Sequence, residues 1–135
     1  MKNDCLFCAI CVGEVPAYVI HEDELFLVIM DRFPVTPGHV LILPKRHAPG
    51  IFDLNDAESA AIMPLARRVA EKIQDTLNPT GLNLLQNNGK AAGQVVFHYH
   101  LHLIPRYEGD NFKFSHPHND PPLSELEEMA GKLRL

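Results

Sequence analysis

Apolar residues recur along the chain with two different periods, and these periods predict its strands and helices. Short apolar runs bounded by charged, Gly, Pro or Asn residues are typical of β-strands. Such runs occur at residues 17–21, 25–30, 38–43, 82–86 and 97–106. Ahead of the fourth run, apolar residues step by three and four positions from Ile62 to Leu77, as in a long amphipathic helix. The pattern predicts an α+β fold, a five-stranded antiparallel sheet with one long helix and short terminal helices.

The long helix has clear start and stop signals and one internal conflict. Residues 55–58, Asn-Asp-Ala-Glu, have the layout of a capping box. Asn78-Pro79 ends the periodic stretch, which gives a helix of about 22 residues. Pro64 lies inside it, and an interior proline removes one helical hydrogen bond at a cost of about 3 kcal/mol. We therefore expect a kink at Pro64 or a break into two helices.

Both ends of the chain are expected to carry short helices. The first covers residues 6–12. Residues 113–122 are rich in Pro, His and Asn and are expected to form an irregular tail. A second capping box at residues 124–127 then opens a short amphipathic helix, which is marginal alone and must dock on another surface. No linker indicates a second domain, so residues 1–135 are expected to form one.

The last apolar run carries three histidines at strict alternation. In a strand, His98, His100 and His102 share one face while the apolar residues between them share the other. In a helix, each two-residue step would turn about 200° and scatter the imidazoles around the circumference. The strand interpretation therefore concentrates three groups able to donate or accept protons in one row.

Such a row is compatible with more than one kind of site. Alternate histidines could ligate a metal whose bound water attacks the substrate. Alternatively, His100 is itself the nucleophile, with one ring nitrogen held by a hydrogen bond and the other free. Solvated or structural histidines are the third possibility. Residue type alone does not choose among these possibilities.

Composition narrows the class of partner and the compartment. The formal net charge of −5 argues against a general nucleic-acid binder, which would carry a basic face. The apolar runs are too short to span a bilayer, and residues 1–4 lead into no signal-like segment. We therefore expect a cytoplasmic protein with neither a nucleic-acid nor a membrane partner.

The cysteines are clustered near the start of the chain. Cys5, Cys8 and Cys11 are an odd number within seven residues, which is not a disulfide framework. Cys5-x-x-Cys8 could supply two of the four ligands of a tetrahedral zinc site, or it could be a complete redox motif. A redox motif normally opens a helix after a strand, and no strand is predicted before Cys5. Zinc is therefore the leading interpretation if two more ligands exist, and Cys11 is expected to pack as a small hydrophobe.

The chain resembles the histidine-triad (HIT) superfamily of nucleotide hydrolases and transferases, in particular its bacterial HIT-like members. The core of the resemblance is the run His98-Tyr99-His100-Leu101-His102-Leu103-Ile104. It extends over about residues 4–112 and includes Asp31, residues 36–47, Asn87 and Gly93-Gln94.

This resemblance implies an enzyme that cleaves nucleoside phosphoramidates or dinucleoside polyphosphates. His100 would attack the α-phosphorus and form a covalent nucleotidyl-histidine, while His98 and His102 orient it and bear charge. The substrate would be a purine nucleotide, a derivative of AMP or GMP. The resemblance also implies a homodimer in which the long helices and the two sheets join.

The resemblance further implies a set of binding residues. Residues that would bind the nucleotide include a pocket for the purine, a ribose-binding carboxylate at Asp31 and groups near the ribose or phosphate. These residues are Leu6, Phe7, Ile29, Asp31, His39, Asn87 and Gln94. For Asp31 an ordinary turn aspartate is the alternative. Some bacterial relatives carry structural zinc, and the matching ligands here are Cys5, Cys8, His47 and His98.

One position departs from the pattern of the superfamily. Val95 stands where several relatives have Ser or Thr reaching the bridging oxygen of the substrate. This departure supports a nucleotide-binding regulatory module without significant turnover as one alternative. The other alternative is a metal-dependent hydrolase that uses the histidine row as ligands.

Overall fold

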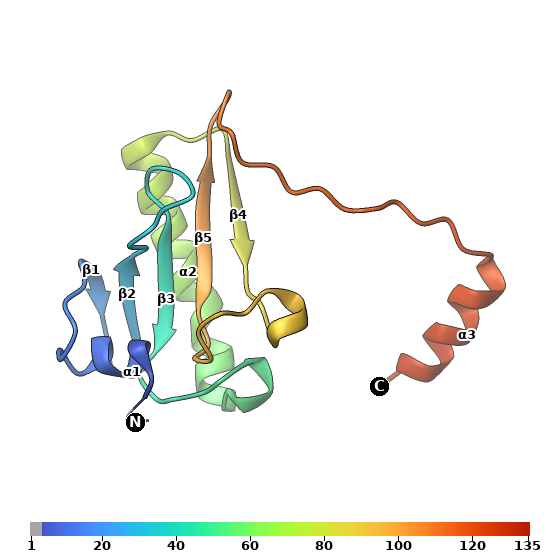
Figure 1. Cartoon of the computed structure of the whole chain (residues 1–135), viewed down its shortest axis with the longest axis horizontal. Helices are drawn as coiled ribbons and strands as arrows, with labels where there is room; N and C mark the ends of the chain where they lie inside the picture. Colours follow the sequence, from blue (N-terminus) through green and yellow to red (C-terminus); the bar gives the residue numbers. More distant parts are fainter. Residues whose placement is uncertain (1–3) are drawn as a thin grey trace.

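Five antiparallel strands form one sheet in the order β1-β2-β3-β5-β4 in the computed structural model (Figure 1). The strands are β1 (Val19–Glu22), β2 (Phe26–Met30), β3 (Val40–Pro44), β4 (Gly81–Leu85) and β5 (Leu101–Arg106). The structure describes residues 4–135. The expectation that residues 1–4 lead into no signal-like segment therefore falls mostly outside the described residues. The predicted α+β fold with a five-stranded antiparallel sheet is confirmed.

Helix α2 (Asp56–Leu77) covers one face of the sheet (Figure 1). Its buried residues, among them Ile62, Leu65 and Val69, pack against side chains of β2, β3 and β5. The predicted capping box forms: the Asn55 side chain accepts from the Glu58 amide at 2.8 Å, and Glu58 accepts from the Asn55 amide at 2.9 Å. Burial of this apolar stripe against the sheet stabilises the packing of α2 on that face.

The helix runs unbroken through Pro64, so the break considered from the sequence does not occur. Pro64 lies on the exposed face of α2, and Ala60, whose carbonyl loses its partner, is exposed as well. Water can therefore hydrate the freed carbonyl. The apolar stripe on the opposite side holds the helix together across the proline.

The other face of the sheet is covered by helix α1 (Leu6–Cys11). Phe7 and Cys8 of this helix pack with buried residues of β2 and β3, including Leu27 and Leu41. Cys5 is the N-cap of α1, and its Sγ accepts a hydrogen bond from the Cys8 amide at 3.3 Å. Two short 3-10 helices, η1 (Ile51–Asp53) and η2 (Lys90–Ala92), lie in the loops after β3 and β4.

The predicted strand at residues 97–106 is wrong in its first four residues, because β5 begins only at Leu101. The pairing with both neighbours stops there: β3, although it continues to Pro44, pairs with β5 no further than Ile42–Leu101, and β4 ends with the pair Leu85–His102. The predicted alternation nevertheless persists. The residues between the histidines belong to the core beneath α2, and the histidines face the α1 side.

The C-terminal helix α3 (Leu123–Leu133) differs from its predicted start. Its N-cap is Pro122, which offers no side-chain hydrogen bond, and Ser124 lies inside the first turn, so the predicted capping box is wrong. No residue of α3 is buried. The tail carries it past β4 and away from the sheet (Figure 1). Among the described residues, no helix is long and apolar enough to cross a membrane.

Candidate active site and metal site

The segment that carries the first two histidines is held by the loop after β3. The Tyr99 amide donates to the Ala48 carbonyl at 2.6 Å, and the His98 Nε2–H donates to the Pro44 carbonyl at 2.7 Å. The His98 side chain is completely buried. A segment outside any strand is thereby given a defined conformation by hydrogen bonds to a neighbouring loop.

His100 has one ring nitrogen held and the other available. Its Nδ1 lies 2.7 Å from the His98 carbonyl oxygen, which can only accept, so Nδ1 carries the proton. In the neutral ring, Nε2 therefore carries the lone pair. The edge-on contact with the Phe7 ring, with centroids 5.0 Å apart, fixes the plane of the imidazole. His100 thus has the tautomer that a nitrogen nucleophile requires.

His102 is set in the opposite tautomer through His39. The Val35 amide donates to His39 Nδ1 at 3.0 Å, so the neutral His39 carries its proton on Nε2. This Nε2–H faces His102 Nδ1 at 2.9 Å and donates to it. His102 must then carry its own proton on Nε2. Adjacent rings, 4.9 Å apart at their centroids, therefore offer a lone pair on His100 and a donor on His102.

Burial keeps these imidazoles neutral. It lowers the pKa of His102 to about 4, helped by the positive charge that His100 and His39 would carry if protonated. Burial likewise lowers the pKa of His100 and of His39, while the Asp31 carboxylate raises both. The rings therefore remain uncharged near neutral pH, which the two tautomer assignments require.

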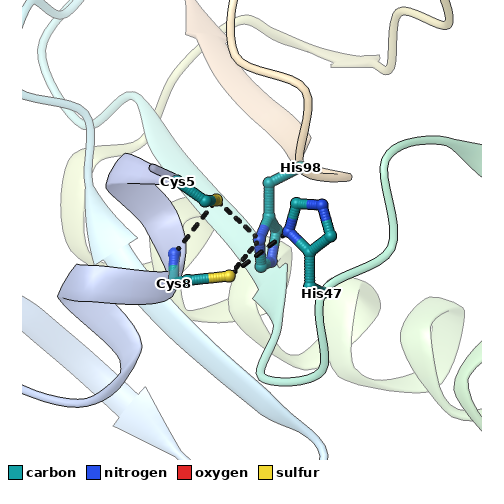
Figure 2. Close-up of side chains that lie close together, drawn as sticks. All are labelled: Cys5, Cys8, His47 and His98. Atoms are coloured by element: carbon teal, nitrogen blue, oxygen red, sulfur yellow. Dashed lines mark hydrogen bonds between the residues drawn. The ribbon is translucent and has the colours of Figure 1, made fainter. Parts of the chain in front are cut away.

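Four side chains converge on a point beside the histidine row (Figure 2). Cys5 and Cys8 come from the start of α1, His47 from the loop after β3, and His98 from the segment before β5. One ligand atom from each lies within 4.8 Å of every other. The shared feature is a set of two soft sulfurs and two imidazole nitrogens, which is a donor set of structural zinc sites.

The distances fit a tetrahedral metal. The Sγ of Cys8 lies 3.3 Å from His47 Nδ1 and 3.5 Å from His98 Nδ1, and Cys5 Sγ lies 3.4 Å from His98 Nδ1. For zinc bonds of about 2.3 Å to sulfur and 2.0 Å to nitrogen, tetrahedral ligands lie roughly 3.5 Å apart. Because the His98 Nε2–H is used by Pro44, its Nδ1 presents a lone pair to the metal. The residues present therefore fit zinc.

A second group of potential ligands, Asp31, His39 and His102, is better explained as a hydrogen-bond relay. The facing nitrogens of His39 and His102 bond each other at 2.9 Å, and Asp31 Oδ2 lies 3.4 Å from His39 Nε2. The Nδ1 lone pair of His39 is taken by Val35. His100 belongs to neither group. The three histidines of the row therefore do not converge on one metal.

The residues expected around the purine occupy different environments. Phe7 and Ile29 are buried with the cluster under α1, whereas Leu6 is half-exposed. Leu6 lines a hollow of about 340 Å³ together with Val95, Val96 and Phe97. Phe7 touches the rings of both His98 and His100, so it also positions the histidines, a role that sequence reasoning did not foresee.

Some of the residues expected near ribose and phosphate already use their polar atoms in contacts within the protein. Asp31 Oδ1 accepts from the Phe33 amide at 2.8 Å, which is the ordinary turn role, while Oδ2 faces His39. Asn87 lies beside Gly93, which has a left-handed φ of +91°. The buried Gln94 side chain braces this loop, donating to the carbonyls of Pro49 and Val96.

Sequence reasoning missed an ion pair between the buried Glu58 carboxylate and the half-exposed Arg46. Glu58 at the start of α2 is 2% exposed, and its Oε1 lies 2.6 Å from Nη2 of Arg46. Arg46 also donates to the Asp53 carbonyl, so the pair ties the loop that carries His47 to α2. The Asn55–Glu58 capping box was the only signal in the sequence. It predicted the helix start but not the arginine, which depends on how the loop folds back.

Fold and site together define a small protein in which a sheet carries an ordered histidine relay beside a candidate zinc site. The chain belongs to the HIT domain family, whose model matches residues 12–109. The protein named Protein hit from Bacillus subtilis is 43% identical over 111 residues, covering 82% of this chain and 77% of that protein. Adenylylsulfatase HINT3 from Arabidopsis thaliana is 42% identical over 110 residues, covering 82% of this chain and 56% of the plant protein.

Solved structures agree with this assignment. A HIT family protein from Bacillus anthracis matches with a TM-score of 0.91 and 39% identity, covering 98% of this chain and 96% of that one. A zinc-bound histidine triad family protein from Mycobacterium smegmatis matches with a TM-score of 0.77 and 38% identity, covering 93% of this chain and 97% of that one. The fold and family predicted from the sequence are thus confirmed.

Proposed function

We propose that the protein is a nucleotide phosphohydrolase or nucleotidyl transferase that works through a covalent nucleotidyl-histidine. The observation that carries this proposal is the opposite tautomers of adjacent rings. His100 offers an Nε2 lone pair because its Nδ1–H is held by the His98 carbonyl at 2.7 Å. His102 offers an Nε2–H because its Nδ1 accepts from His39. A base and a donor side by side suit attack on a phosphate.

The proposed reaction has two steps. His100 Nε2 attacks the α-phosphorus in line, an N–P bond forms, and the bond to the leaving group breaks with its electron pair. The His102 Nε2–H donates to a non-bridging phosphoryl oxygen and stabilises the charge on it. Water then attacks the same phosphorus, the N–P bond breaks with its electron pair returning to His100 Nε2, and the nucleoside monophosphate leaves. The proton lost by the water balances the proton taken up by the leaving group of the first step. The His98 carbonyl accepts from His100 throughout, so it stabilises the positive ring of the intermediate.

The nucleotide is proposed to lie along the α1 side of the histidine row. Leu6 offers exposed apolar surface for a purine, the buried Phe7 and Ile29 are proposed to form the floor of that pocket, and Asp31 is the proposed ribose-binding carboxylate. Asn87 lies beside the loop at residues 89–94, whose amides are candidates for phosphate contacts. Gln94 is assigned a supporting role, because both N–H groups of its side chain are already donated to backbone carbonyls.

Structural zinc is proposed at Cys5, Cys8, His47 and His98. When bound, the ion would stabilise thiolate ligands, and it would offset the burial that raises the pKa of Cys5. It would also tie α1 to the loop after β3 and to the histidine row. His98 serves both sites: its ring is a ligand, and its carbonyl orients His100.

A homodimer joined at β4 is also proposed. Strand β4 lies at the end of the sheet, and Leu84 within it is 42% exposed. The opposite edge strand, β1, is shorter and carries an irregularity between Val19 and His21, which discourages pairing with another strand. The regular edge of β4 is therefore the better surface for a second copy.

A nucleotide-binding module without significant turnover is the second candidate. It is favoured by Val95, which is 85% exposed beside the histidine row and has no hydroxyl to assist a leaving group. A metal-dependent hydrolase is less well supported, since His100 lies in neither group of potential ligands.

The test is release of AMP by the wild type and His100→Ala. Substrates are an adenosine phosphoramidate, a diadenosine polyphosphate and, because of the name of the Arabidopsis relative, adenylyl sulfate. Wild-type turnover that His100→Ala loses, with trapping of a nucleotidyl-protein after rapid acid quench, supports the proposal. Saturable AMP binding with no product would favour the binding module. Inactivation by a chelator while the fold persists, with no trapped intermediate, would favour the metal hydrolase.

A further inference from the structure

Helix α3 carries an apolar stripe that no part of residues 4–135 buries. Its large apolar residues fall within about 120° of the helix circumference. They are Leu123, Leu126, Met129 and Leu133, and at least half of each is exposed. A helix of 11 residues is marginal in water without packing. The position of α3 therefore requires a surface to receive the stripe.

A matching groove runs along α2 on the side of β1. It has a volume of about 440 Å³ and is lined by apolar residues that include Ile20, Met30, Val69 and Leu77. Its lining extends along α2 from Leu65 to Leu77, which at 1.5 Å per residue is about 18 Å. The 11 residues of α3 span roughly the same length, about 16 Å.

The charges around the groove and the stripe are complementary. Arg68 and Lys72 line the groove, and neither forms an ion pair within the part of the chain that the structure describes. On α3, Glu125 and Glu127 border the apolar stripe, one on each side. Glu128, on the far face, is already paired with Lys132 at 3.2 Å. Glu125 and Glu127 beside the stripe thus complement Arg68 and Lys72 in the groove.

The helix that fills the groove is better supplied by a second copy of the protein than by the same chain. The tail leads α3 beyond β4, whereas the groove is bordered by β1 at the opposite edge of the sheet (Figure 1). In a two-fold dimer joined near β4, each tail points toward the other subunit. We propose that α3 of one copy docks, stripe inward, in the groove between α2 and β1 of a second copy. This inference rests on the proposed dimer but not on the proposed chemistry.

Photo-crosslinking in the full-length protein tests the docking. Met129 is replaced by p-benzoylphenylalanine, and Glu128, on the opposite face of α3, is replaced in a matched control. Equal amounts of ¹⁴N- and ¹⁵N-labelled protein are mixed, so links between copies give mixed-isotope peptides. We expect dimer-sized adducts from position 129 that map to residues 65–77 or to β1, with about tenfold less from position 128. Adducts within one chain, adducts elsewhere on the second copy, or none at all would overturn the inference.

A charge exchange provides the second test. The double variant Arg68→Glu with Lys72→Glu should lower the crosslinking yield from position 129 about tenfold. Adding Glu125→Lys and Glu127→Lys should restore it. Arg67→Glu is the control, because Arg67 pairs with Glu71 and does not line the groove. Sedimentation of the same samples measures dimer formation separately. A dimer in which α3 crosslinks elsewhere rejects the docking of α3 alone. A monomer rejects both the docking and the proposed homodimer.

Discussion

His39 decides the tautomer of His102, whose ring contacts that of the proposed nucleophile, His100. Its Nδ1 is taken by the Val35 amide at 3.0 Å, which leaves only Nε2 to donate. The sequence predicted a histidine beside the row at this position but not the direction of its hydrogen bond. That direction depends on a backbone amide four residues earlier.

Replacing His39 should therefore act through His102. We expect His39→Ala to lower kcat about 100-fold, because His102 is no longer held with its proton on Nε2. His39→Gln, whose amide can donate to His102 Nδ1, should recover a large part of the loss. Single-turnover kinetics would measure both variants. Equal losses in the two variants would show that His39 only fills space.

The pH dependence of turnover should reflect the burial of His100. Its pKa is lowered from 6.5, so the nucleophile stays unprotonated, and kcat/KM should stay constant, to a pH below 6.5. The Asp31 carboxylate stabilises the protonated ring and raises its pKa. Asp31→Asn should therefore move the acidic limb of the pH profile to still lower pH.

A pH–rate profile of wild type, Asp31→Asn and the distant His116→Asn would test this. An acidic limb that moves upward in Asp31→Asn, or one that moves equally in His116→Asn, would contradict the assignment.

At the scale of elements, the start of α2 and the loop after β3 form one unit. Glu58 caps the helix and pairs with Arg46, which also bonds the Asp53 carbonyl. The loop supplies Pro44 and Ala48, whose carbonyls hold the His98 segment. The Arg46–Glu58 ion pair therefore supports the geometry of the histidine row from outside the site.

Arg46→Ala should destabilise the protein by roughly 1–3 kcal/mol, because it leaves the buried Glu58 carboxylate without its half-exposed charge partner. Urea unfolding would measure the change in the free energy of unfolding. Arg67→Ala, which removes an exposed pair with Glu71, should cost less than about 0.5 kcal/mol. The Glu58→Gln variant combined with Arg46→Ala should recover part of the loss. A loss for Arg46→Ala no larger than that for Arg67→Ala would contradict this account.

Strand β5 illustrates which element boundaries follow from the sequence. Alternating apolar and imidazole residues predicted one strand from Phe97 to Arg106, yet β5 begins at Leu101. The alternation correctly assigned the side chains to two faces, since the face depends on the local backbone. The boundary depends instead on where the backbone pairing with β3 and β4 stops, which no local pattern in residues 97–100 reports.

At the scale of the whole molecule, the candidate zinc site joins three distant parts of the chain. The first part supplies Cys5 and Cys8, the second His47 and the third His98. None of the three parts alone has the four ligands of a complete site. A ligand that binds only the folded state stabilises it, by about 4 kcal/mol when its free concentration is 1,000-fold above Kd. A metal here would therefore stabilise the fold and the orientation of His100 together.

Removing zinc should lower both stability and turnover. We expect the wild type to bind one zinc per chain, Cys8→Ser to bind none, and Cys11→Ser to bind as the wild type does. Cys11 is the matched control because it packs near Pro44, outside the four-residue group. Chelation should lower Tm in wild type and Cys11→Ser alike. Metal analysis and thermal unfolding would measure this, and a zinc-free wild type would reject the site.

The sequence by itself determined the strand and helix types, the capping of α2 and the family, because these depend on residue periods and on motifs a few residues long. Through the family resemblance it also predicted Cys5, Cys8, His47 and His98 as one group of candidate ligands. Only the tertiary structure decided that their ligand atoms converge, that Val35 and His39 set the tautomer of His102, and that Arg46 neutralises Glu58. The physical reason is that hydrogen-bond direction, burial and pKa are set by groups distant in sequence, which come into contact only in the folded protein.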